Sequence, residues 1–173
     1  PEPRILTGWS PETDDELRAA IKECLERSPD CSKSSHGPIS SWDIYDVDDM
    51  SDMFVDIKSK GDSGPMSDES NVDFVEPDRD PIPGADKFNG DVSKWEVLNV
   101  VRMQSMFQYA SSFNADLSQW DVSSVTDMKS MFQDASVFNA DLSKWDVSRV
   151  HDMCNMFCFA TLFNADLSNW DVS

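Results

Sequence analysis

The sequence predicts an α/β repeat protein: a short solenoid of about five coils, each with one short strand and one short helix, preceded by an N-terminal capping helix. One observation is a 25-residue period, because one segment returns almost unchanged at 116–123, 141–148 and 166–173. The large apolar residues keep the same step: Phe88, Phe113, Phe138 and Phe163, then Met103, Met128 and Met153. Repeats of this length bury their apolar faces only against neighbouring repeats.

The N-terminal segment, residues 1–35, is expected to hold an amphipathic helix over 11–27 that closes the open end of the core. Ser10 can cap it, and Pro11 suits the first helical position. An apolar stripe follows at helical spacing: Leu17, Ala20, Ile21, Cys24 and Leu25. The alternative is an independent helix that binds a partner.

Cys24 lies on that stripe, and Cys31 follows the Ser28-Pro29-Asp30 turn. Seven residues with a turn between them allow the two sulfurs to meet, so we expect a disulfide, with two free buried thiols as the alternative. A disulfide would place the protein in an oxidising space, either secreted, at the cell surface or in an organelle lumen such as the thylakoid lumen.

Three further segments follow. Residues 36–54 form a degenerate first repeat, in which Trp42, Met53 and Phe54 keep the internal spacings. Residues 55–86 are an acidic, Pro/Gly-rich insertion with nine acids. Phe74, Asp78 and Asp80 are its candidate contacts to a basic partner, the alternative being a solvated acidic loop. Residues 87–173 carry the regular repeats.

Within each repeat, Val125, Met128, Met131, Phe132 and Ala135 recur at helical spacing, which predicts a helix of about two turns with Ser123 or Ser124 as its cap. A short strand is expected around 116–118. One strand and one short helix in each repeat is a leucine-rich-repeat-like layout.

The repeat Met-x-x-Met-Phe-x-x-Ala-x-x-Phe-Asn-x-Asp-Leu-Ser-x-Trp-Asp-Val-Ser resembles a repeat of unknown function found in mycoplasma surface lipoproteins and in marine algae and protists. That family is related to the BspA-like leucine-rich repeats. The resemblance covers 87–173 closely and 36–54 in weaker form. It implies a surface or secreted protein that takes part in adhesion or protein–protein contact, and it implies no enzyme activity.

Stacked repeats would align identical side chains in ladders. We expect the Asp ladders, at 91, 116, 141 and 166 and at 121, 146 and 171, to accept backbone N–H bonds at the adjacent turns. The Asn ladder at 89, 114, 139 and 164 is expected to do the same. Ca²⁺ held between the Asp ladders is the alternative. The Trp ladder at 95, 120, 145 and 170 is assigned to the core, with an exposed carbohydrate-binding strip as the alternative.

His151, Cys154 and Cys158 would share one face of the last repeat helix. Equivalent positions carry variable, mostly polar residues, which indicates the outer face and makes the whole set candidate partner contacts: Gln104, Gln108, Lys129, Gln133, His151, Cys154 and Cys158. The two cysteines could be free thiols, could contact or bond to a partner, or could bind a metal that lacks a fourth protein ligand.

The formal charge of −19 is spread over all segments, which disfavours nucleic acid and anionic lipid and favours a protein with a basic surface. No apolar run is long enough to span a membrane. Because no catalytic motif or cofactor site is present, we expect a non-catalytic protein–protein interaction module. The alternative is a structural accessory subunit of a large membrane-associated complex, such as the lumenal side of an algal photosystem supercomplex. Ser173 falls within a repeat, so we expect either a longer natural chain or a cover over the last coil.

Overall fold

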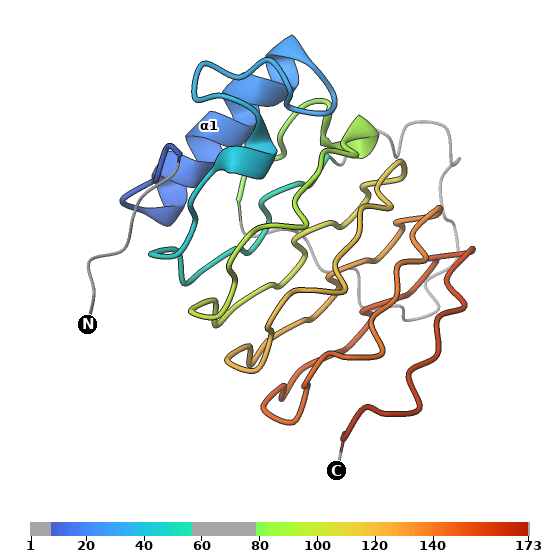
Figure 1. Cartoon of the computed structure of the whole chain (residues 1–173). Coiled ribbons are helices and arrows are strands. Elements are labelled where there is room, and N and C mark those ends of the chain that lie inside the picture. Colours follow the sequence, from blue (N-terminus) through green and yellow to red (C-terminus); the bar gives the residue numbers. More distant parts are fainter. Residues whose placement is uncertain (1–7, 57–78, 173) are drawn as a thin grey trace, which may run out of the picture.

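The computed structural model describes residues 8–56 and 79–172. Its helices are α1 (Asp14–Arg27) and two 3₁₀ turns, η1 (Ile39–Ser41) and η3 (Ala85–Lys87). In Figure 1, α1 lies across one end of a stack of coils that continues to the C-terminal end of the chain. We number the coils by their tryptophans: the first contains Trp42, the second spans 88–112, the third 113–137, the fourth 138–162, and the fifth begins at Phe163.

Helix α1 begins three residues later than the sequence analysis placed it. Thr13 is the N-cap, and its hydroxyl accepts the Glu16 backbone N–H at 3.1 Å. The segment Thr13-Asp14-Asp15-Glu16 is a capping-box pattern, which outweighs the Ser10-Pro11 signal. The predicted stripe is correct, since all five of its side chains are buried.

The disulfide between Cys24 and Cys31 is present. Both residues are fully buried in the main core, and the Cys31 carbonyl accepts the N–H of Ile39 at the start of η1. The bond therefore ties α1 to the chain that enters the first coil.

The short helix predicted in each repeat is wrong. Within residues 87–172, all of which are described, the structure has no α-helix. Instead, alternate N–H groups of the second coil donate to carbonyls of the third at 2.8–2.9 Å: those of Met103, Ser105, Phe107 and Tyr109. The N–H groups of Met106, Gln108 and Ala110, each next to one of these donors, donate to the carbonyl three residues earlier. The third coil donates to the fourth by the same scheme. In a helix, all of these N–H groups would donate to carbonyls of their own coil. This segment would then form no backbone bonds with the adjacent coil.

The strand expected around 116–118 is also misplaced. These residues are not assigned to a strand, and parallel bridges instead connect Asp49, Arg102, Asp127 and Asp152. The inter-coil bonds therefore lie where the helix was expected. This backbone requires left-handed residues at the same two positions of successive coils: Ser105 and Tyr109, Ser130 and Asp134, and Asn155 and Phe159, with φ between 53° and 64°.

The core consists of aromatic columns that run along the stack. Phe107 of the second coil packs on two rings of the third, Phe113 at a centroid distance of 3.9 Å and Phe132 at 5.7 Å. Trp95, Trp120 and Trp145 form a parallel column with centroid distances of 6.4–6.5 Å. Each coil thus buries its rings against the coils on either side.

The described ends of the predicted insertion belong to the first coil. Val55 and Asp56 are buried; the Val55 carbonyl accepts the Ile82 N–H at 2.7 Å, and an Asp56 carboxylate oxygen accepts the Gly84 N–H at 2.8 Å. Ala85, which is 25 residues before Ala110, is also buried. Val55, Asp56, Ile82 and Ala85 therefore pack as part of the first coil, although they fall within the range of 55–86 that was assigned to the insertion.

Candidate functional site

The repeated aspartates stabilise turns. Asp91, Asp116, Asp141 and Asp166 each accept the backbone N–H of the serine two residues later at 2.9–3.0 Å. For Asp116, Asp141 and Asp166, the backbone bond from that serine lowers the pKa most, and its hydroxyl adds to the effect. For Asp91 the hydroxyl of Ser93 lowers the pKa most. These carboxylates therefore stay ionised while serving as turn acceptors.

Asparagines form a second ladder, but not through the adjacent turns. The side-chain oxygen of Asn89 accepts the backbone N–H of Asn114 in the next coil at 2.9 Å, and the same bond joins Asn114 to Asn139 and Asn139 to Asn164. The ladder thus sets the register between coils, which is a correction to the local Asx-turn interpretation.

The tryptophan ladder belongs to the core. Trp95, Trp120 and Trp145 are each 3% exposed. The indole N–H of Trp120 donates to the Val92 carbonyl at 2.9 Å, and that of Trp145 donates to the Leu117 carbonyl at 3.1 Å. A carbohydrate strip built on these three rings is therefore excluded by their burial.

Two of the predicted outward contacts point inward. Gln108 and Gln133 are buried, and the Gln108 amide N–H donates to the Gln133 side-chain oxygen at 3.2 Å. Gln104 and Lys129 are half-buried. The error follows from the helix assumption, because a helix would align positions 104 and 108 on one face, whereas the turns of this coil direct Gln108 into the interior.

His151, Cys154 and Cys158 lie in the part of the fourth coil that pairs with the third through backbone bonds. His151 and Cys154 are exposed, and Cys158 is half-buried. Burial, followed by the carboxylate of Asp134, raises the pKa of the Cys158 thiol. Among the described residues, no three His, Cys, Asp or Glu side chains are grouped as a metal site would require.

Of the three contact residues predicted in the acidic insertion, the structure describes one. Phe74 and Asp78 lie outside the described residues, whereas Asp80 is exposed and its carbonyl accepts a bond from the Arg18 guanidinium of α1. The same guanidinium also donates to the Asp52 carbonyl in the first coil. Arg18 therefore joins the returning chain to the capping helix and the first coil.

The sequence analysis missed an ionic cluster beside this junction. Arg102 donates to one Asp49 carboxylate oxygen through Nε at 3.1 Å and Nη2 at 2.8 Å, and Arg79 approaches the same oxygen at 3.9 Å. Burial opposes ionisation of Asp49, but bonds from Ser51 and Arg102 hold its pKa below the usual value. The sequence contained one signal for this cluster. Arg102 occupies the repeat position at which the next two coils have Asp127 and Asp152, so a basic side chain stands where the repeat has acidic ones.

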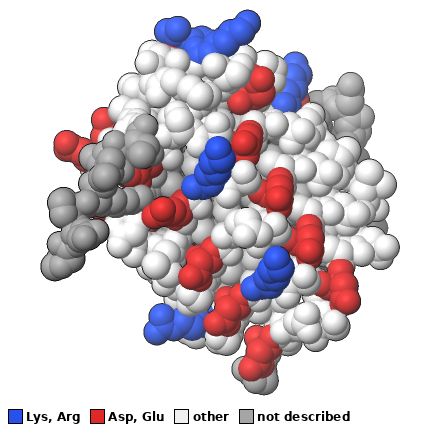
Figure 2. Space-filling model, viewed as in Figure 1, with Lys and Arg blue, Asp and Glu red and all other residues white. Residues whose placement is uncertain are grey.

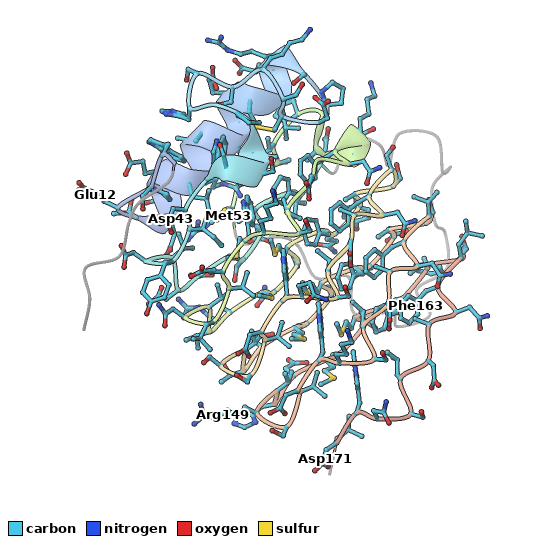
Figure 3. The ribbon with its side chains drawn as sticks, viewed as in Figure 1. Glu12, Asp43, Met53, Arg149, Phe163 and Asp171 are labelled. Carbon is cyan, nitrogen blue, oxygen red and sulfur yellow. A yellow bond between two sulfur atoms is a disulfide. The ribbon has the colours of Figure 1, made fainter. Side chains whose placement is uncertain are left out.

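The surface is acidic and carries a few exposed apolar side chains. Figure 2 shows acidic side chains distributed across the coils, with fewer basic ones between them. Arg149 extends outward from the edge of the fourth coil in Figure 3. The exposed large apolar residues are Leu98, Val101, Val137, Phe159, Leu162 and Val172. A hollow of about 340 Å³ beside residues 93–98 contains no histidine or cysteine in its lining.

Comparison with known families agrees with the repeat pattern. The family described as "Mycoplasma protein of unknown function, DUF285" matches residues 28–73 and 80–173, which is most of the chain. The chain belongs to this family. No curated protein and no solved structure matches the chain significantly. The family has no described function or enzymatic activity. None of the described helices of this DUF285 protein is long and apolar enough to cross a membrane.

Proposed function

We propose that this protein is a non-catalytic protein–protein interaction module, built as a short solenoid of stacked coils related to the BspA-like repeats. One observation carries the proposal: the residues that recur in every coil are engaged in building the stack. The Asp side chains hold turns, the Asn side chains bond adjacent coils, and the Trp side chains fill the core. Repeated polar residues are therefore accounted for by structure, and the outward positions that differ between coils are left to act on other molecules.

The surface chemistry supports a basic protein partner. The chain carries 33 acidic residues against 14 Lys and Arg, and five of the repeated aspartates have lowered pKa values. A surface that remains anionic at neutral pH accelerates the approach of a basic partner and repels nucleic acid.

The Cys24–Cys31 bond supports an oxidising location, either secreted, at the cell surface or in an organelle lumen. Mass measurement of the native protein under non-reducing conditions, after alkylation of free thiols, tests this location. We expect two alkylated cysteines, Cys154 and Cys158. Four alkylated cysteines would overturn the oxidising location.

A second candidate is a structural accessory subunit of a membrane-associated complex, such as the lumenal side of an algal photosystem supercomplex. The exposed apolar residues favour it, because Leu98 and Val101 in the second coil are 43% and 41% exposed on an otherwise charged surface. Such side chains are typical of surfaces that are covered in an assembly.

One experiment tests both candidates. The native protein is crosslinked in its source membranes, extracted with mild detergent and separated on a native gel, and the co-migrating proteins are identified by mass spectrometry. Co-migration with one large complex at fixed stoichiometry supports the accessory subunit. A smaller, substoichiometric crosslinked partner supports the interaction module. Migration as the free chain with and without crosslinker overturns both.

A further inference from the structure

The repeat itself shows which outward side chains the fold requires. A side chain needed for stacking recurs every 25 residues, so a position whose residue type changes is free of that requirement. Phe159 occupies the position of Tyr109 and Asp134, and Leu162 that of Ser112 and Val137. The fourth coil thus carries two large apolar side chains at positions where Asp134 and Ser112 show that a small polar side chain is also accepted.

The backbone conformation at position 159 does not favour phenylalanine. Its φ is 59°, in the left-handed region that the fold imposes equally on Tyr109 and Asp134. Short polar residues such as Asp tolerate this region better than a bulky aromatic residue. The left-handed backbone therefore does not explain Phe159.

These apolar side chains form one continuous edge. Val137, Phe159 and Leu162 are 37%, 48% and 60% exposed. The Leu162 N–H donates to the Ser136 carbonyl at 3.2 Å, and the Asp134 N–H donates to the Cys158 carbonyl at 2.8 Å, so the two chain segments run side by side. We call Val137, Phe159 and Leu162 the apolar edge.

The outward direction of Val137 and Leu162 is a property of the repeat. Val137 is exposed although coils pack on both sides of its own, and Ser112, one coil earlier, is also exposed. Asp134, at the position equivalent to Phe159, is half-exposed between two coils. Inner coils therefore present the Leu162 position to the surface, whereas at the Phe159 position Tyr109 is only 8% exposed and Asp134 is half-exposed.

We propose that the apolar edge is the docking surface for a protein segment that presents an aliphatic or aromatic side chain flanked by lysine or arginine. This inference rests on the proposed function. The apolar half of the ligand follows from Phe159, Leu162 and Val137, since burying them removes apolar surface from water. The basic half follows from charge complementarity. The chain has a net charge of −19, and Asp134 lies beside the edge, close enough to act on the Cys158 thiol. A second copy carries the same −19 charge and would be repelled.

The test uses the full chain with a fluorescent label on the exposed thiol of Cys154, in a Cys158→Ser background so that one free thiol remains. A displayed library of random peptides of about 12 residues is panned on this protein, with counter-selection on the Phe159→Ser/Leu162→Ser variant. Leu98→Ser/Val101→Ser is the matched control, because it removes a second exposed apolar pair, 43% and 41% exposed, from the second coil. Thermal melts check that every variant is folded.

We expect enriched peptides to combine an apolar anchor with lysine or arginine, and to change the fluorescence of the label on binding. Affinity should fall about tenfold in the Phe159→Ser/Leu162→Ser variant and change by no more than about twofold in the control. It should also weaken between about 0.05 M and 0.5 M salt.

Absence of enriched peptides, enrichment of acidic peptides, or equal loss in the control variant would overturn the docking surface. So would dimerisation of the unlabelled chain that is abolished by Phe159→Ser/Leu162→Ser, since a second copy would then occupy the edge. If the partner recovered by crosslinking binds wild type and Phe159→Ser/Leu162→Ser equally, the interaction module stands and the apolar edge does not.

Discussion

Replacing Phe132 by alanine should destabilise the stack more than the same change at Phe157, one coil later. Phe132 is fully buried and stacks on the equivalent rings of both neighbouring coils, Phe107 and Phe157, each at 5.7 Å. It also packs on Phe138 at 3.9 Å. Phe157 is half-buried, with Phe132 at 5.7 Å and Phe163 at 3.9 Å. The two positions have the same chemistry and differ in burial.

The magnitude follows from cavity formation. A Phe→Ala change in a packed core costs about 3–5 kcal/mol in the free energy of unfolding. At about 2–4 °C per kcal/mol for a chain of this size, Phe132→Ala should lower Tm by about 6–20 °C. Because part of its surface already contacts water, Phe157→Ala should cost about 1–3 kcal/mol. In a repeat array the effect at Phe132 also weakens two interfaces between coils.

Urea titration followed by far-UV circular dichroism measures both values. Phe132→Leu is the control, since it keeps an apolar side chain and should cost only about 1.5 kcal/mol. Equal losses for Phe132→Ala and Phe157→Ala would refute the assignment of the Phe columns as a core shared between coils. A loss below about 1 kcal/mol for Phe132→Ala would refute its burial.

Three other predictions concern the disulfide, a turn aspartate and a buried serine. Cys24→Ser/Cys31→Ser opens a short loop and should lower the free energy of unfolding by roughly 2.5 kcal/mol, which reduction of the wild type should reproduce in a urea titration. Asp141 has a folded pKa below its unfolded value near 3.9, so it contributes stability above that pH that is lost as the pH falls through the folded value. Asp141→Asn keeps the acceptor without the charge, and its stability should fall less steeply than wild type between about pH 4 and 2; parallel curves would contradict this. The Ser130 hydroxyl is buried without a hydrogen-bond partner among the described residues, and its φ is 55°. Ser130→Gly should therefore raise stability by about 1 kcal/mol, and more than Ser130→Ala; a loss in both would indicate a bound water.

The stacking of the repeats was readable from the sequence, whereas the path of each coil was not. The 25-residue step identified Trp120 and Phe132 as core and placed Asp116 at a turn, because residues that must contact their own copies have to recur. The spacing of Met128, Met131, Phe132 and Ala135 fits a helix as well as it fits the observed series of three-residue turns. Periodicity reports which side chains point inward, and it does not report whether backbone donors bond within a coil or across coils.

The same ambiguity displaced part of the candidate site. Gln108 and Gln133 were expected outside because the corresponding position in the fourth coil is a cysteine and variable positions are usually exposed. They are buried because polar amides stacked in register can satisfy each other, as the 3.2 Å bond between them shows. Variability between coils is therefore an incomplete guide to exposure when neighbouring copies carry complementary side chains.

The acidic ladders and the apolar edge have separate physical roles in the proposed recognition. Turn bonds lower the pKa of Asp116 and Asp141, so adjacent coils keep their charges despite mutual repulsion. This fixed negative field acts over about 8 Å at physiological ionic strength and speeds the approach of a basic partner. The contact energy must come from desolvation of apolar surface, which Phe159 and Leu162 supply. Salt should therefore slow association with little effect on dissociation, whereas Phe159→Ser/Leu162→Ser should accelerate dissociation with little effect on association.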